Sequence, residues 1–279
     1  MNRHVLITGT STGIGLDCAR LLIEQGYPVI GTVRKASDAA QVRARLGQAF
    51  TPLLLDMTNL GAIPAAIEEI TALVGDNGLA ALVNNAGIAS PNAPLGVQPL
   101  EEVRAMFEVN VLGLLALTQA CLPLLGAYRG ARQAGRIVNI GSTSGAIATP
   151  MAGSYAISKF AVEALSDTLR RELSIYGIQV AVIEPGPIRT PIWGKAERDP
   201  RYTHGDYAAP MEALYRMAEK MVEQGAPVAS VSRAVLHAIR SPRPKVRYPL
   251  NPMWQLNRLL PTRLMDRLIT GKFGLRRLQ

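Results

Sequence analysis

Short apolar runs alternate with longer amphipathic stretches along most of the chain. The short runs contain few polar positions, which is typical of strands buried on both faces of a sheet. The longer stretches repeat apolar positions every three or four residues, as helices packed on a sheet do. The predicted strands are Val5–Thr8, Val29–Val33, Thr51–Leu55, Ala80–Val83, Arg136–Ile140, Val180–Ile183 and, with a weaker pattern, Lys245–Tyr248.

The amphipathic stretches predict helices that connect these strands. This alternation predicts a mostly parallel sheet with helices on both faces, an α/β fold of the Rossmann-type, doubly wound class in a single domain. The 279 residues, of which 48% are hydrophobic, suffice for the core of such a domain. The predicted helices are Gly15–Gln25, Ser37–Leu46, Ile63–Val74, Leu100–Leu124 and Ser154–Tyr176.

The regular alternation ends after Glu184. Residues Pro185–Pro210 contain five prolines and no sustained period, and irregular stretches of this length in a compact domain are usually functional or mobile. We predict that this segment forms a mobile loop over an apolar pocket, with Ile188, Ile192 and Trp193 as apolar contacts.

The last part of the chain differs from the rest in charge and in pattern. The whole chain carries a formal charge of +9, yet from residue 229 to the end eleven basic residues accompany a single acidic one, so the remainder is nearly neutral. Within Asn251–Thr270, leucines recur at every fourth position, at Leu256, Leu260, Leu264 and Leu268, which predicts an amphipathic helix.

This pattern divides the chain into a catalytic domain at residues 1–250 and a basic amphipathic extension at residues 251–279. Two roles for the extension are open. Its leucine face packs on the domain near the substrate site, or it rests weakly, with its arginines, on an anionic membrane. Nucleic acid is not predicted as a partner, because neither a binding motif nor aromatic interleaving accompanies the charge.

Cysteine and histidine usage argues against a metal site. Cys18 and Cys121 lie far apart without a CxxC pattern, and the three histidines are scattered. Both cysteines fall in apolar helical patterns and are expected to be free thiols of a cytoplasmic protein. The first strand begins too early for a signal segment, and the apolar run Val111–Ala127 is shorter than the ~20 residues of a membrane span.

A glycine-rich turn, TGTSTGIG, joins the first predicted strand to the first helix. Its glycines permit a tight turn and let backbone N–H groups at a helix N-terminus approach a phosphate. Simple turn chemistry is the alternative, but the position in the first βαβ unit favours a dinucleotide. The predicted contacts are Gly9, Ser11, Thr12, Gly13, Ile14 and Gly15.

The residues that follow the second strand favour one cofactor over the other. A carboxylate usually binds the ribose hydroxyls of NAD(H) here, but this chain has Arg34 and Lys35. A guanidinium suits the 2′-phosphate of NADP(H), so NADP(H) is predicted in preference to NAD(H). For Arg34 the alternative is an ordinary surface charge at a strand end.

Further cofactor contacts are expected where the third and fourth strands end. Ligands of open α/β sheets bind outside the carboxyl ends of the strands. The third strand ends in Asp56 and Met57, which lie where adenine would be bound, and the fourth ends in VNNAG. Small residues there permit close approach, and we select Asn84, Ala86 and Gly87.

The segment SYAISK contains a tyrosine and a lysine four residues apart, Tyr155 and Lys159. On a helix these side chains share a face. The ammonium favours the phenolate, so the tyrosine is predicted to exchange a proton near neutral pH as a general acid or base, with the lysine also holding a ribose hydroxyl. The alternative is an incidental pair on a surface helix.

Two more polar side chains are candidates for the same site. Ser142 follows the fifth strand and is predicted to hydrogen-bond a substrate oxygen, with Ser144 as its rival. Asn110 lies within an apolar helical pattern, where an unbonded amide is costly. It either bonds the backbone at a kink, or extends a proton relay through water to Lys159, or does both.

Taken in this order, TGTSTGIG, NNAG, Asn110, Ser142 and YAISK resemble the short-chain dehydrogenase/reductase family, over roughly residues 5–190. The resemblance implies hydride transfer to or from nicotinamide, with Asn110, Ser142, Tyr155 and Lys159 as the catalytic tetrad. It also implies that EPGPIRT lies beside the nicotinamide amide. The contacts implied in that segment are Pro185, Gly186, Ile188 and Thr190.

The segments GTVRK and EPGPIRT and the Arg/Leu-rich tail resemble the hydroxysteroid- and retinol-dehydrogenase-like branch of that family. This implies an NADP(H)-dependent oxidoreductase acting on a small apolar alcohol or carbonyl compound, and a homodimer or homotetramer. The alternatives are a 3-oxoacyl-carrier-protein reductase and a non-catalytic NADP(H) sensor. Many NADP-using members of the family carry a basic residue within the glycine turn, but this chain has Ser11 and Thr12 there, so the cofactor preference depends on Arg34.

Overall fold

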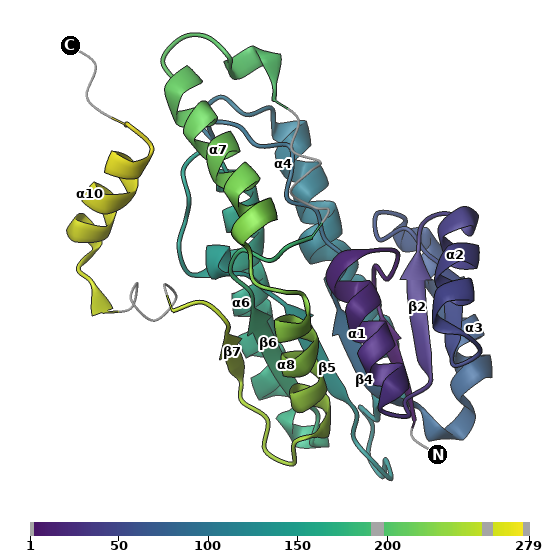
Figure 1. The fold of residues 1–279 in the computed structure, drawn as a ribbon. Helices are drawn as coiled ribbons and strands as arrows, with labels where there is room; N and C mark the ends of the chain where they lie inside the picture. The colour runs from purple at the N-terminus through teal and green to yellow at the C-terminus, as the bar shows by residue number, and fades with distance from the viewer. Residues whose placement is uncertain (1–2, 191–197, 253–258, 276–279) are drawn as a thin grey trace.

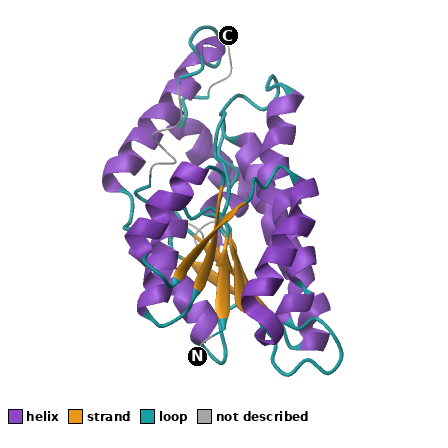
Figure 2. Ribbon diagram, turned by 90° about the vertical axis from the view of Figure 1, so that its right-hand side faces the viewer, coloured by secondary structure: helices purple, strands orange, loops and turns teal. Residues whose placement is uncertain are grey.

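A computed structural model describes residues 3–190, 198–252 and 259–275 of the chain. Its centre is a sheet in the order β3-β2-β1-β4-β5-β6-β7, with all neighbouring strands parallel. Helices cover both faces of this sheet, as predicted (Figure 2). The strands are β1 (His4–Ile7), β2 (Val29–Val33), β3 (Phe50–Leu54), β4 (Leu79–Asn84), β5 (Arg136–Ile140), β6 (Gln179–Glu184) and β7 (Arg247–Pro249).

Four of the five helices predicted before β6 are present and the other is divided; within the described residues, two helices follow β6 where the sequence analysis expected none (Figure 1). These two are α7, which begins near the end of the predicted loop, and α8, which packs beside α1. The helices are α1 (Gly13–Glu24), α2 (Ala36–Leu46), α3 (Ile63–Val74), α4 (Leu100–Phe107), α5 (Leu114–Cys121), α6 (Gly153–Glu172), α7 (Ala208–Gln224), α8 (Ala229–Arg240) and α10 (Thr262–Lys272).

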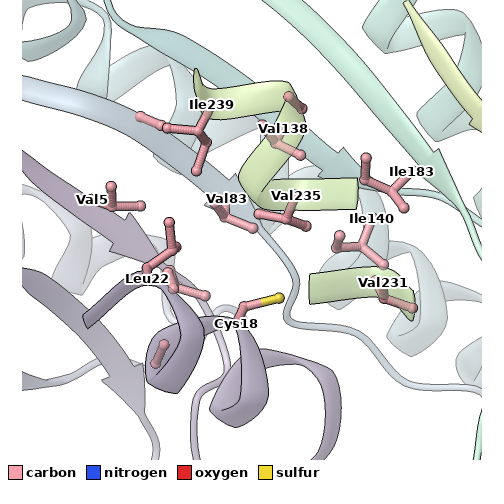
Figure 3. Packing of buried hydrophobic residues seen from close by; sticks show 14 of the residues in the cluster. Val5, Cys18, Leu22, Val83, Val138, Ile140, Ile183, Val231, Val235 and Ile239 are labelled. Carbon is pink, nitrogen blue, oxygen red and sulfur yellow. The ribbon is translucent and has the colours of Figure 1, made fainter. Parts of the chain in front are cut away.

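The core lies on both faces of the sheet because successive strand residues point to opposite sides. Val5 belongs to the cluster formed with α1 and α8, whereas its neighbour Leu6 belongs to the cluster under α3, α5 and α6. Figure 3 shows the first cluster, in which Val235 of α8 approaches the sheet beside Cys18 of α1. Each such buried side chain stabilises the fold by about 1.5–3 kcal/mol.

The helix predicted at Leu100–Leu124 is interrupted. The segment Glu108–Gly113 adopts a π-helix, labelled η3, between α4 and α5. Among the described residues, the stretch Leu100–Cys121 has the length and hydropathy of a membrane span, a test that a core helix also passes. Here Leu117 and Cys121 are buried in the core under the sheet, which agrees with the interpretation as a core helix.

The helix predicted at Asn251–Thr270 is tested only in part, because residues 253–258 lie outside the described residues. The helix that is described, α10, begins only after Pro261, because proline favours the first turn of a helix and disrupts its interior. It packs by Met265 and Phe273, so the leucine face is not the buried one. Leu264 and Leu268 are exposed, and the predicted leucine at position 256 lies outside the described residues.

Part of the predicted loop after β6 is described. It is irregular apart from a 3₁₀ turn, η8 (Pro200–Tyr202), and it is joined to α7 by an ion pair between Arg198 and Glu212 at 3.1 Å. The main-chain N–H of Asp199 also donates to the Tyr215 hydroxyl at 2.9 Å. The expected apolar contacts at positions 192 and 193 lie outside the described residues.

Both cysteines are free and buried. Burial raises the pKa of the Cys18 and Cys121 thiols to about 12, so neither is a reactive thiolate near neutral pH. Among the described residues, histidine, cysteine, aspartate and glutamate form no cluster that would hold a metal ion.

Candidate active site

A cavity of about 240 Å³ opens where the strands of the central sheet end. Its walls come from the turn after β1 and from the segments that follow β2, β3, β4, β5 and β6. Topology brings these segments together, because parallel strands all end at the same edge. The predicted residues that line it are Gly9, Ser11, Thr12, Gly13, Ile14, Arg34, Asp56, Met57, Ala86, Gly87, Ser142, Tyr155, Lys159, Pro185, Gly186, Ile188 and Thr190.

The glycine turn adopts a conformation that requires glycine at two positions. Gly9 has φ +71° and Gly13 has φ +59°, in the left-handed region that other residues rarely adopt. Gly15 has a different role, since it does not line the cavity. A Cβ there would collide with the carbonyl oxygen of Gly9, so this glycine lets α1 pack closely on the turn.

Arg34 lies at the rim of the cavity, directly after β2, and its side chain is exposed. Asp56 faces the same region from the end of β3. Hydrogen bonds from the N–H and hydroxyl of Thr58 hold the Asp56 carboxylate at 2.9 Å and 2.8 Å and, with the charge of Arg34, lower its pKa. Lys35 does not line the cavity, because it caps α2 and points to solvent.

Of the two asparagines in VNNAG, the structure brings Asn85 and not Asn84 to the cavity. The Asn84 side chain is buried under the sheet, where its Nδ2 donates to Thr118 and Asn139. Asn85 donates instead to the carbonyl oxygens of Thr8 and Gly9 at 2.8 Å and 3.0 Å. The earlier choice of Asn84 is therefore corrected: strand alternation turns it away from the ligand edge.

Tyr155, Lys159 and Ser142 meet in this cavity, as predicted. Lys159 Nζ lies 5.8 Å from the centre of the Tyr155 ring. It donates to the carbonyl oxygen of Ile140 at 2.8 Å, at the end of β5. Ser142 caps the following 3₁₀ turn, where its Oγ accepts from the N–H of Ser144 at 3.1 Å. Ser144, the rival candidate, thus contributes its main chain and does not line the cavity.

The protonation of this pair differs from the prediction. Burial raises the pKa of Tyr155, and a hydrogen bond with the Ser142 side chain opposes that shift. Burial also lowers the pKa of Lys159 to about 8, while the negative charge of Glu163 acts in the other direction. In this state the tyrosine is therefore protonated at neutral pH, as a proton donor must be.

Asn110 does not line the cavity but braces its wall. Its Oδ1 accepts from the N–H of Ile88, and its Nδ2 donates to the carbonyl oxygen of Ile88, both at 2.9 Å. The Nδ2 also donates to Ser158 at 3.0 Å, whose hydroxyl donates to the carbonyl oxygen of Tyr155 at 2.7 Å. The π-helix places the amide there, so the predicted bonding of Asn110 to the backbone at a helix irregularity is observed.

A charged cluster that the sequence analysis missed lies behind Lys159. Glu163, one turn further along α6, accepts from Arg247 Nε at 3.1 Å. The same guanidinium lies 3.1 Å from Asp167 and 3.7 Å from the fully buried Glu184. The sequence could not predict this cluster, because β7 and α6 are far apart in the chain and come into contact only in the tertiary structure.

The family of the chain follows from comparison with known proteins. The family model described as short chain dehydrogenase matches residues 3–201. The chain belongs to the short-chain dehydrogenase family. Within this family it is 40% identical, over 95% of both chains, to the NADPH-dependent 3-dehydrocapnine reductase of Ornithobacterium rhinotracheale.

Members of the predicted branch are also similar to this chain. Human 17-beta-hydroxysteroid dehydrogenase type 6 is 32% identical over 96% of this chain and 88% of its own length. Among solved structures, the closed form of serine dehydrogenase complexed with NADP+ superimposes with a TM-score of 0.76 and 27% identity, covering 90% of this chain and 95% of that one. The fold and the hydroxysteroid- and retinol-dehydrogenase-like assignment are confirmed.

Proposed function

We propose that this short-chain dehydrogenase uses NADP(H) to interconvert an apolar ketone or aldehyde and its alcohol. One observation carries the proposal: the glycine turn, Arg34, Ser142, Tyr155 and Lys159 all line a single cavity. A cofactor-binding turn and a proton-donating group are the two parts that such a reaction needs. The relative named as an NADPH-dependent reductase supports the cofactor and the direction.

The residues present fit a dinucleotide phosphate. The backbone at Gly9 and Gly13 forms a cradle at the N-terminus of α1, and side chains at these positions would strain it. The exposed Arg34 offers two parallel N–H donors to a 2′-phosphate. Asp56 lies near enough for the charge of Arg34 to lower the pKa of its carboxyl, and it accepts hydrogen bonds from Thr58.

When bound, NADPH supplies a hydride to the carbonyl carbon of the substrate. Tyr155 donates the proton that the carbonyl oxygen requires, which completes the alcohol. The Ser142 hydroxyl donates a hydrogen bond to the same oxygen and orients it. The charge of Lys159 stabilises the tyrosinate that remains, and Asn110 holds the Ile88 wall and the turn of α6 that presents Tyr155.

The substrate is proposed to be a steroid-, retinoid- or long-chain-like compound. The cavity that contains Tyr155 and Ser142 is also lined by apolar side chains, those of Ile88, Ala89 and Ile188. Such side chains bind hydrocarbon and offer no partner to a charged group. The relatives named for 17-beta-hydroxysteroids and 3-dehydrocapnine support this choice.

Two alternatives are tested by the same experiment. A 3-oxoacyl-carrier-protein reductase would place its acidic partner near the basic tail, and a sensor would bind NADPH without turnover. The test measures oxidation of NADPH by its absorbance, with steroid, retinoid, long-chain and acyl thioester ketones. Turnover of apolar ketones and aldehydes supports the proposal. Turnover of thioesters alone favours the first alternative, and tight cofactor binding without any turnover favours the second.

We propose further that residues 1–250 form the catalytic domain of a cytoplasmic homodimer or homotetramer. Leu112, Ile157 and Phe160 are 42%, 41% and 43% exposed on the adjoining elements η3 and α6, and a second copy would cover them. The buried free thiols suit a reducing compartment. Size-exclusion chromatography of Phe160→Asp should give a smaller species, and unchanged elution of an oligomer would refute this interface.

A further inference from the structure

We propose that the outer face of α10 docks this enzyme on an anionic lipid bilayer, on the side of the protein where α10 packs against α7. The proposed face comprises Leu264 and Leu268 with Arg263 and Arg267. The biological reason for docking rests on the proposed function, because an apolar substrate dissolves in a membrane. The physical argument for docking is independent of that function, because it uses only the exposed leucines and the charges of α10.

The apolar part of this face is turned away from the protein. On α10, the buried residues Met265 and Phe273 mark the inner side, with the partly buried Ile269 between them. Leu264 and Leu268 stand one turn apart on another side and are 41% and 55% exposed. Leu259, just before the helix, is 80% exposed. Three exposed leucines thus lie on α10 and just before it, within ten positions of the chain.

The charged part of the face flanks those leucines. Arg263 and Arg267 are one turn apart and adjoin Leu264 and Leu268 in the sequence. Both arginines are exposed, and within the described part of the chain neither forms an ion pair with a carboxylate. Leucines that enter the headgroup region beside arginines that meet lipid phosphates are the pattern of an interfacial helix.

The inner side of α10 connects this face to the active site. Phe273 packs in a cluster with Met211 and Tyr215 of α7 and with Met151. Met151 lies four residues before Tyr155, on the segment that leads into α6. Figure 1 shows α10 on the outer side of α7, at the margin of the molecule. A bilayer under α10 would therefore lie on the side of the protein where α7 meets the segment that leads into α6.

A second exposed apolar segment lies near the same cluster. Val97 and Leu100 are 55% and 63% exposed. The hydroxyl of Tyr202 donates to the carbonyl oxygen of Val97 at 3.4 Å, and Tyr202 packs against the cluster that holds Phe273. These side chains extend the apolar surface around the same end of the protein.

The test is co-sedimentation of the full chain with vesicles of phosphatidylcholine alone or with added phosphatidylglycerol, at low and high salt. Binding is expected only to the anionic vesicles and should weaken in high salt, because exposed charges are screened. The variants L264D/L268D and R263S/R267S should each reduce the bound fraction roughly tenfold or more.

Matched controls remove the same chemistry elsewhere. The variant L73D/I175D changes two exposed apolar residues, 39% and 79% exposed, on other elements. The variant R45S/R129S removes two exposed arginines and the same net charge. Both controls should bind vesicles as the unaltered protein does.

Three outcomes would overturn the proposal: no binding to anionic vesicles, binding that ignores lipid charge and salt, or equal loss in the control variants. A change of oligomeric state in L264D/L268D without a change in vesicle binding would show that a second copy covers this face. Turnover of a water-soluble ketone is measured in parallel. It should stay unchanged in the α10 variants, so failure of docking and failure of the enzymatic proposal are distinguishable.

Discussion

Arg247, on the edge strand β7, donates from Nε to Glu163 Oε2 of α6 at a distance of 3.1 Å. This one guanidinium also faces Asp167 and the buried Glu184. It is three-quarters buried, and it neutralises carboxylates that would be costly to bury alone. The pair ties the last strand of the sheet to the helix that carries Tyr155 and Lys159.

Arg247→Gln should destabilise the protein by about 3 kcal/mol near neutral pH, because buried carboxylates lose their counter-charge. Burial already raises the pKa of Glu163, and loss of the arginine would raise it further. A group whose pKa is raised by folding destabilises the protein increasingly as pH rises above its unfolded value. The deficit in urea unfolding free energy should therefore be larger at pH 7 than at pH 5. An equal deficit at both would contradict this account.

Glu163→Gln should shift the pH dependence of kcat/KM. This shift should exceed any effect of the substitution on the stability of the fold. Burial lowers the pKa of Lys159 to about 8, and the negative charge of Glu163 opposes that shift. Reduction requires the charged lysine, so kcat/KM should fall above about pH 8 in the unaltered enzyme. In the variant the lysine loses that support, and the fall should begin at lower pH. Glu163→Asp, which keeps the charge, should restore much of the profile, and coincident profiles for all three enzymes would remove Glu163 from this role.

Tyr155→Phe should reduce kcat at least tenfold and leave NADPH affinity largely intact, because only the proton donor is lost. Lys159→Arg should also lose activity, since a planar guanidinium cannot take the place of the compact ammonium between Ile140 and the Tyr155 ring. Stopped-flow turnover and cofactor fluorescence measure the two effects. Retention of normal kcat in either variant would exclude the assigned role.

Arg34→Asp should weaken NADPH binding much more than NADH binding. The new carboxylate would repel a 2′-phosphate and could accept hydrogen bonds from a free ribose hydroxyl. The quantity to compare is the ratio of the two dissociation constants, with Lys35→Asp as a neighbouring charge control that lies outside the cavity. If the ratio of the NADPH and NADH dissociation constants changes equally in both variants, the effect comes from the overall charge of this region and not from a contact of Arg34 with the 2′-phosphate.

Gly15→Ala should impair cofactor binding even though this residue does not line the cavity. The added methyl group would collide with the carbonyl oxygen of Gly9 and with Asn85 Nδ2, and so distort the turn. Gly47→Ala, at a position where a Cβ meets no atom within 4 Å but φ is +78°, serves as a control for backbone strain alone. If both variants bind NADPH normally, the close packing at Gly15 is not required.

The fold could be predicted in most of its parts because local patterns decide them. Strands that are apolar on both sides, such as Val29–Val33, have few alternatives to a buried parallel sheet. Once the strands are parallel, their carboxyl ends share an edge, and that brings the segments of Gly9 and Ser142 together, with Tyr155 in the first turn of the helix that follows. The choice of these residues followed from spacing and chemistry in the sequence.

Only the tertiary structure distinguishes Asn84 from Asn85, because which side a strand residue faces depends on where the strand begins. Only it joins Arg247 to Glu163 across 84 positions of sequence. For α10 too, the tertiary structure was needed. The four-residue spacing of leucines predicted a helix, but the spacing does not determine which face of the helix is buried. Met211 and Tyr215 of α7 pack against Phe273, so this side of α10 is buried, and Leu264 and Leu268 remain exposed. Which face of a helix is buried depends on the neighbouring element as much as on the helix itself.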